Sequence, residues 1–211
     1  MTGRSIDVYT LYGIHTYMSE AQSPTRKRIV DAATKLFYGE GIGRVSVDAV
    51  AEKAGLTKRT LYYHFRSKDD LVTAYLEERE QPNLRRMTGW FKDTEGSLAE
   101  KVAAIFTNLA REVRSTKWKG CAFLRTSAEL VALPGHPAVK VTARHKEDFE
   151  NWLTGEFAAR GIADAAELSR QVMLLINGAF ALVLVHRDAA YMEAAGRAAT
   201  ALVSAKAGAK A

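Results

Sequence analysis

The chain has 211 residues, of which 47% are hydrophobic and 26% are charged. This length is ample for a buried core and fits one domain, or one small and one medium domain. The single cysteine, Cys121, excludes an intrachain disulfide and gives no sign of secretion. Its apolar neighbours suggest a buried small side chain more than a reactive thiol.

The positive charge is concentrated in one segment. The formal net charge is +6, and residues 24–68 hold ten Lys/Arg against four Asp/Glu, which accounts for the whole excess. A basic module on a nearly neutral body is the electrostatic footprint expected for nucleic-acid binding. The alternative is a solvated basic face.

Residues 1–23 are predicted to be disordered or a mis-annotated extension. Asp7 and His15 interrupt their apolar character and Arg4 is their only Lys or Arg, so they make a poor signal peptide. They are also too short to span a bilayer. Met18 offers an alternative start.

The first predicted helix begins at Ser23-Pro24, a serine cap followed by proline at the first helical position. Glycines 39, 41 and 43 end it, and the basic residues 26–28 can lie along a phosphate strand. Its apolar residues recur at the spacing of an amphipathic helix: Ile29, Ala32, Ala33, Leu36 and Phe37.

Residues 46–65 are predicted to form two short helices joined by a tight turn, a helix-turn-helix. Gly55 lies between them, where a left-handed dihedral is expected. The apolar faces are Val50, Ala51, Ala54, Leu61 and Phe65. The second helix carries hydrogen-bond donors on its remaining faces: Thr57, Lys58, Arg59, Thr60, Tyr62, Tyr63 and His64. Such a helix can enter a major groove and read base edges.

The segment from Pro24 to Leu71 resembles the DNA-binding domain of TetR-type transcriptional regulators. The run LYYHFRSKDDL at residues 61–71 is the most specific part. Asp48 departs from a basic residue found there in some members, so it receives no base contact. The other matching positions are Phe37, Gly41, Ser46, Val47, Ala51, Ala54, Gly55, Leu56 and Thr60.

The predicted DNA-binding residues have different roles. Lys58, Arg59 and Thr60 are the candidates for base-edge contact. Phosphate contacts are expected from Tyr62, Tyr63, His64 and Lys68, the last of these as the resemblance implies. The remaining predicted DNA-binding residues are Ser46, Val47 and Thr57. The N-terminus of the helix that begins after Ser46 is expected to bind a phosphate. Tyr62 packing under the helix and His64 acting as a cap remain the alternatives.

The rest of the chain is predicted to be helical, with no strand-like alternation. Ser67 opens a helix to about residue 81, which Pro82 should interrupt or kink; the alternative is that the helix resumes past Pro82 to Phe91. Further helices are expected at residues 98–113, 121–132 and 137–160, with a polar loop at 114–120. The resemblance implies an all-α fold of about nine helices: a three-helix DNA-binding domain at 24–68, then a ligand-binding and dimerisation domain at 69–207.

The last two helices, residues 172–185 and 189–206, are predicted to form a homodimer interface. The first is apolar almost all round but shorter than the ~20 residues of a membrane span, and Asn177-Gly178 is expected to break it. The second is rich in alanine and contains Gly196, and small side chains let helices pack closely. The alternative is that both helices complete a monomer's core.

The body is expected to act as a sensor, because family members resembling this chain bind a small-molecule inducer among the middle helices and then leave a palindromic operator. Repression is the default that the resemblance implies. Core packing is the alternative role for every candidate pocket residue. These candidates are Trp90, Phe106, Phe123, Phe149, Trp152, Asn177 and Phe180.

No enzyme is predicted, because the sequence contains no HExxH, CxxC, GxSxG or phosphate-loop motif. His136 lies in a Pro-Gly-His-Pro loop that favours a turn over a ligand, and His145 and His186 are too far apart in sequence to predict a metal site. No cofactor is expected. The expected protein is cytoplasmic and does not bind membranes. The other candidate function is a ligand-binding helical dimer that acts through a protein partner with little DNA binding.

Overall fold

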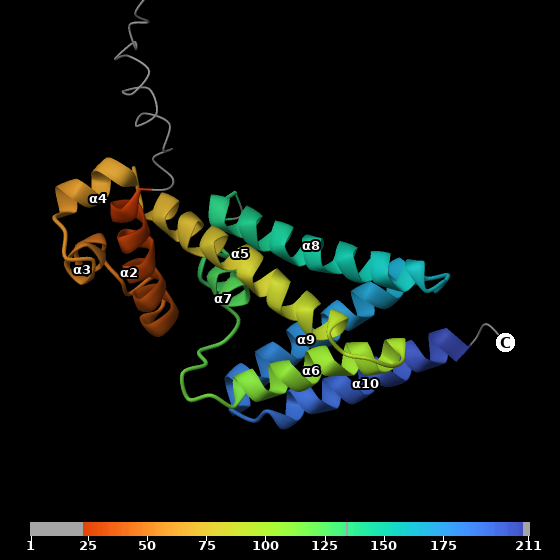
Figure 1. Cartoon of the computed structure of the whole chain (residues 1–211). Coiled ribbons are helices and arrows are strands. Elements are labelled where there is room, and N and C mark those ends of the chain that lie inside the picture. The colour runs from red at the N-terminus through yellow and green to blue at the C-terminus, as the bar shows by residue number, and fades with distance from the viewer. Residues whose placement is uncertain (1–22, 134, 209–211) are drawn as a thin grey trace, which may run out of the picture. The chain divides into compact units, whose positions relative to one another are not determined.

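The computed structural model describes residues 23–133 and 135–208, and this part contains nine α-helices, α2 to α10, and no strand (Figure 1). The all-α prediction is therefore confirmed. Apart from Ser23, the extension predicted at residues 1–23 lies outside the described residues. The chain divides into two compact units between Tyr75 and Leu76, within helix α5 (Lys68–Lys92). The predicted domain boundary after residue 68 falls in the first turn of that helix.

The first unit contains α2 (Pro24–Glu40), α3 (Val47–Lys53), α4 (Lys58–His64) and the start of α5. The Ser23 hydroxyl accepts from the Arg26 amide at 3.1 Å, and Gly41 ends α2 with φ 94°. Helix α2 packs against α3 and α4. It buries Ile29, Ala32, Ala33 and Phe37, four of the five residues predicted for its apolar face, and Leu36 is half-buried.

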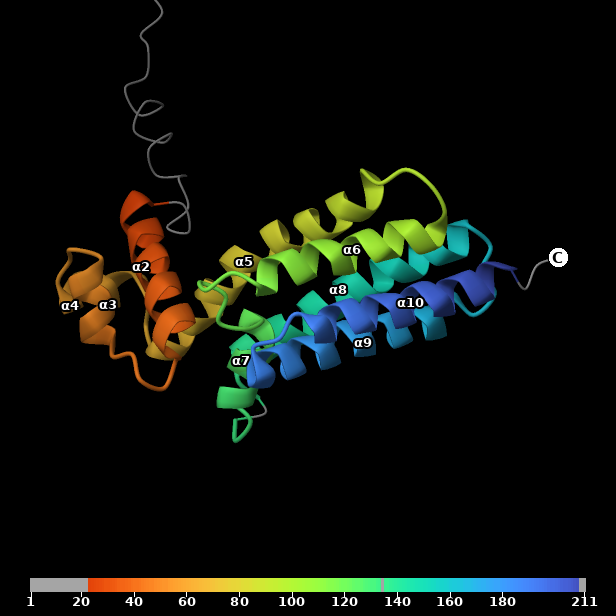
Figure 2. The same ribbon diagram turned by 90° about the horizontal axis from the view of Figure 1, so that it is seen from below.

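The second unit contains the rest of α5, then α6 (Leu98–Val113), α7 (Ala122–Glu129), α8 (Pro137–Ala159), α9 (Ala165–His186) and α10 (Ala190–Gly208). Helix α10 packs along α6 and α9, and α8 packs against α9 and α7, as Figure 2 shows. One apolar core joins α5, α6, α8, α9 and α10.

The interruption predicted at Pro82 and the break predicted at Asn177-Gly178 are wrong, whereas the alternative that the helix runs past Pro82 to Phe91 agrees with its end at Lys92. Helix α5 continues through Pro82; this residue is exposed, and so is Glu78, whose carbonyl loses its helical partner to the proline ring. Helix α9 continues through Asn177-Gly178 and begins at Ala165, seven residues before the predicted start. Its buried face carries the helix past Gly178, and the Asn177 side chain donates to the Met173 carbonyl at 2.8 Å.

Because α9 has 22 residues, it is long and apolar enough to cross a membrane by length and composition, contrary to the shorter predicted helix. It packs as a core helix, since Leu168, Val172, Ile176 and Val183 are at most 2% exposed in the second unit.

The α6–α10 contact depends on Gly196. A Cβ atom added there would lie 2.7 Å from the Cβ of Phe106, so α10 can approach α6 this closely only without a side chain at that position. We predicted Gly196 to favour packing against a second subunit. The structure instead directs this face of α10 at the core of its own chain.

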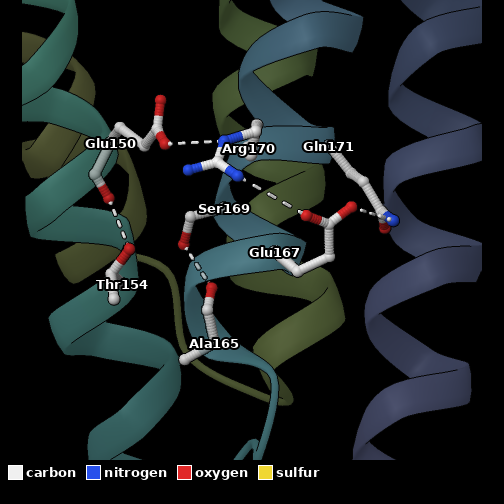
Figure 3. Close-up of polar contacts among 7 residues, drawn as sticks. All are labelled: Glu150, Thr154, Ala165, Glu167, Ser169, Arg170 and Gln171. Carbon is white, nitrogen blue, oxygen red and sulfur yellow. Dashed lines mark hydrogen bonds and ion pairs between the residues drawn. The ribbon is translucent and has the colours of Figure 1, made fainter.

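Polar contacts between α8 and α9 lie near the start of α9 (Figure 3). The Arg170 guanidinium lies 3.6 Å from a Glu150 oxygen of α8 and 3.8 Å from a Glu167 oxygen of its own helix. Since Arg170 is 62% exposed, these ion pairs contribute little stability. The Ser169 hydroxyl is fully buried and donates to the Ala165 carbonyl at 2.8 Å.

Candidate nucleic-acid interface

Helix α4 is anchored by one apolar face, which leaves its other faces to solvent. Leu61 is fully buried and Phe65, at the C-cap, is 4% exposed. At the other end, the Thr57 hydroxyl accepts from the Thr60 amide at 3.1 Å and is hydrogen-bonded to the Thr60 hydroxyl at 2.8 Å. Both predicted threonine contacts therefore belong to a helix cap in this structure, and α4 is held as a short rigid rod.

The exposed faces of α4 carry most of the predicted donors. Tyr63 is 75% exposed and Tyr62 is 44% exposed. Arg59 is exposed, and its guanidinium has no hydrogen bond or ion pair with any residue in the described part of the chain. His64 is half-buried, with its ring edge-to-face against Tyr63 at 5.1 Å between centroids. The structure thus brings these side chains onto one short helix, where Arg59, Tyr62 and Tyr63 are exposed and His64 is half-buried.

The predicted turn before α4 is present, and Ser46, predicted as a phosphate seat, also caps α3. Gly55 has φ 64°, in the left-handed region that favours glycine. The Ser46 hydroxyl caps α3 by accepting from the Ala49 amide at 3.1 Å. Val47, the first residue of α3, is half-buried. The Arg28 guanidinium donates to the Ala54 carbonyl at 2.7 Å, so a cation of α2 satisfies the end of α3.

Several other cations have partners within the first unit. The Lys68 ammonium donates to the Ile42 carbonyl at 2.6 Å, which ties the start of α5 to the turn after α2. Lys27 pairs with Asp31 at 2.9 Å, and the Arg26 guanidinium lies over the Phe65 ring at 4.9 Å. These residues have a structural role whatever they contact in DNA.

Two exposed arginines near the helix-turn-helix received no role in the sequence analysis. Arg44 lies two residues before the α3 cap, and Arg66 follows the end of α4. Their position next to a short helix in the sequence was the signal that could have marked these two arginines as candidates. They add positive charge on either side of the motif.

One ion pair links α3 and α4 at the surface. The Lys58 ammonium lies 3.0 Å from a carboxylate oxygen of Asp48, and the two side chains are 54% and 64% exposed. The hydrogen bond from the ammonium to Asp48 raises the pKa of Lys58 above its ordinary value. Lys58 therefore differs from its neighbour Arg59, which has no such partner in the described chain.

The predicted ligand-binding residues are divided between packing sites in the second unit. Phe106, Phe149 and Phe180 are core residues, and Trp90 and Trp152 pack against the same core. Asn177 bonds within its own helix. Phe106 also lines a groove of about 590 Å³ between α6 and α10, together with Arg111 and Arg197.

Phe123 belongs to a separate aromatic contact. It stacks on the His145 ring with 3.8 Å between centroids. His145 is 3% exposed, and its Nδ1 atom has no hydrogen-bond partner among the described residues. Burial, helped by the nearby Lys146 charge, lowers the pKa of His145 to about 4. In the part of the chain that is described, no group of three or more His, Cys, Asp and Glu is placed to hold a metal ion.

Residues 29–75 match the family model of bacterial regulatory proteins of the tetR family. The HTH-type transcriptional regulator SrpR of Pseudomonas putida is 40% identical over 58 residues, covering 28% of this chain and 27% of that protein. TtgR, another HTH-type transcriptional regulator of Pseudomonas putida, is 30% identical over 102 residues, covering 46% of this chain and 48% of that protein. The chain therefore spans less than half the length of these curated relatives.

The fold likeness extends over most of the chain. The crystal structure of a TetR-family transcriptional regulator from Streptomyces coelicolor is 29% identical, with a TM-score of 0.72, and the match covers 90% of this chain and 97% of that one. The matched proteins named here are described as transcriptional regulators. The chain therefore carries a tetR-family DNA-binding domain at residues 29–75, and over most of its length it has the fold of a TetR-family transcriptional regulator.

Proposed function

We propose that the chain is a cytoplasmic repressor that binds a palindromic DNA operator as a homodimer and is released from it by a small molecule. The observation that carries the proposal is α4, a short helix anchored by Leu61 and Phe65 with exposed donors on its other faces. It lies in the basic segment 24–68. A helix of this kind fits a major groove, and the surrounding cations attract phosphates.

The proposed DNA contacts of α4 and of the start of α5 are of two kinds: contacts to base edges, which recognise sequence, and contacts to phosphates, which position the duplex. Arg59 is exposed without a partner in the described chain, so its guanidinium is available for a bidentate contact to guanine, worth about 1–3 kcal/mol of discrimination. Tyr62 and Tyr63 are exposed, and their hydroxyl groups suit phosphate contacts. Lys68 keeps donors for a phosphate while one donor holds the Ile42 carbonyl.

Dimerisation through α9 and α10 is supported by apolar residues that the single chain leaves exposed. Leu174 and Val185 are 68% and 73% exposed. The exposed residues of each helix recur at helical spacing: Leu174, Gly178, Ala181, Leu182 and Val185 on α9, and Ala194, Ala198, Ala201, Leu202 and Ala205 on α10. Contiguous apolar stripes of this kind mark protein interfaces. A second copy of the chain would cover these residues in a four-helix contact. The dimer would then present two DNA-binding domains, one for each half of a palindromic operator.

Control by a small molecule requires that the body have two arrangements and that the ligand favour the one that does not fit DNA. Five of the candidate pocket residues, Trp90, Phe106, Phe149, Trp152 and Phe180, supply aromatic rings at one core, which suits an apolar or planar inducer. The other candidate function, a dimer acting through a protein partner, would use the same body but would leave the exposed donors of α4 unexplained.

A mobility-shift titration tests the proposal, using duplexes from the region upstream of the protein's own reading frame at several salt concentrations. We expect one fragment to bind preferentially, with an affinity that falls steeply as salt rises. A protein that ignores every duplex in dilute buffer would favour the protein-partner function instead.

A further inference from the structure

An acidic side chain stands within the surface that is proposed to face DNA. Asp48 is the second residue of α3, Lys58 is the first residue of α4, and their charged atoms are 3.0 Å apart across the helix-turn-helix corner. Both side chains are more than half exposed, so the pair lies at the surface and is not buried within the fold. A surface pair of this kind contributes little to stability, which leaves room for a role in binding.

The pair changes which cations of α4 are free to meet phosphates. Lys58 and Arg59 are adjacent, but only Lys58 is hydrogen-bonded to a carboxylate in the described chain. The Asp48 hydrogen bond and charge also hold the pKa of Lys58 above its ordinary value, so the ammonium stays charged at neutral pH. A phosphate that approaches Lys58 must therefore displace or tolerate the Asp48 carboxylate, whereas Arg59 carries no such opposing charge.

We propose that Asp48 is a specificity-determining residue that acts through Lys58. Its carboxylate keeps the Lys58 ammonium from contacting the phosphates of a duplex of any sequence, and it holds this ammonium in one orientation. The inference rests on the proposed function, since it concerns how the same surface binds DNA. Contacts to phosphate carry no sequence information, so a cation withheld from them lowers affinity for all duplexes alike. Orienting that cation toward a base edge favours the operator.

The expected effect follows from counterion release. Each additional phosphate neutralised steepens the dependence of log K on log salt by about 0.9. Freeing Lys58 by Asp48→Asn should therefore raise the affinity for a duplex of scrambled sequence about eightfold at ~0.1 M salt. The affinity for the operator should rise less, because Lys58 loses its fixed orientation. The ratio of the two affinities should fall.

The test is a double-mutant cycle on the full chain. Asp48→Asn, Lys58→Met and the double variant are titrated by fluorescence anisotropy against a scrambled duplex and against the fragment selected by mobility shift. Glu52→Gln is the matched control: it removes the same charge from an exposed position of α3, but no described contact joins Glu52 to Lys58. We expect the gain from Asp48→Asn to vanish when Lys58 is Met. The effect of Glu52→Gln should be the same in both backgrounds.

The outcomes separate this inference from the proposed function. If the unaltered chain binds no duplex, the proposed function fails. If it binds, but Asp48→Asn and Glu52→Gln have equal effects with or without Lys58, then Asp48 acts only as a general charge and the inference is overturned. Circular dichroism verifies that each variant is folded. Asp48→Ser, which keeps a polar side chain in the first turn of α3, replaces Asp48→Asn in the cycle if that variant melts early.

Discussion

A close approach of two helices in the second unit can be tested by adding a single methyl group. In Gly196→Ala, the new Cβ would lie 2.7 Å from Cβ and 3.2 Å from Cγ of Phe106, whereas carbon atoms in contact prefer about 3.5–4.0 Å. Phe106 is 1% exposed and cannot swing into solvent. Relief therefore requires α10 to move away from α6 by a sizeable fraction of an ångström.

Two opposing effects set the magnitude. Overpacking a well-packed contact costs about 1–3 kcal/mol, while replacing glycine by alanine inside a helix returns about 1 kcal/mol. We expect Gly196→Ala to lower the free energy of unfolding by up to about 2 kcal/mol. Gly155→Ala in α8 is the control, because nothing lies within 4 Å of its Cβ position. That variant should gain up to about 1 kcal/mol.

Urea denaturation followed by circular dichroism measures both variants, at one fixed protein concentration because dimerisation would make stability concentration-dependent. The midpoint should fall for Gly196→Ala and rise for Gly155→Ala. A Gly196→Ala protein as stable as Gly155→Ala would mean that α10 does not pack this closely on α6.

Three further predictions concern the second unit. Burial lowers the pKa of His145 from 6.5 to about 4. Between these two values the unfolded chain binds more protons than the folded chain, so the free energy of unfolding should fall by about 2 kcal/mol when the pH is lowered from about 7 to 5. Urea unfolding at both pH values measures this fall, which should be smaller in His145→Gln. Arg144→Met should lose about 2–3 kcal/mol in the same assay, because it leaves the Glu80 carboxylate, 8% exposed, without its two hydrogen bonds of 2.9 and 2.7 Å; a loss near zero would contradict the pair. Leu174→Lys should shift the protein toward monomer in sedimentation velocity, whereas Val131→Lys, also highly exposed but outside the α9–α10 stripes, should not.

Much of the first unit could be predicted from the sequence because its signals are local. Ser23 and Ser46 cap helices, and Gly41 and Gly55 adopt positive φ as expected for helix ends. Caps and glycine turns depend on neighbouring residues only, so short-range patterns are sufficient.

The partners of the charged residues could not be predicted in this way. Lys68 reaches the Ile42 carbonyl across 26 positions, and Lys58 meets Asp48 across ten. Such contacts depend on how the helices fold back on one another, which no local spacing encodes. The same limit hid the role of Arg28, whose guanidinium donates to the Ala54 carbonyl at the end of α3.

The interruption predicted at Pro82 and the break predicted at Asn177-Gly178 were wrong because tertiary packing overrides local propensity. Pro82 is tolerated on an exposed turn, and Gly178 lies in a helix held by buried residues on its opposite face. The long-range contact of Gly196 with Phe106 likewise assigns this glycine to the core of its own chain. The seven candidate ligand residues remain a prediction, since their aromatic spacing also fits a packed core.

Selection of bound duplexes from a random pool, followed by sequencing, tests the central claim most directly. We predict a sequence with two-fold symmetry, and we predict that Arg59→Ala relaxes the preference at the same base pair in both halves while the remaining positions persist. If no sequence is enriched, or if the enriched sequence lacks two-fold symmetry, the result would contradict the claim that the two α4 helices of a dimer recognise bases in the major groove.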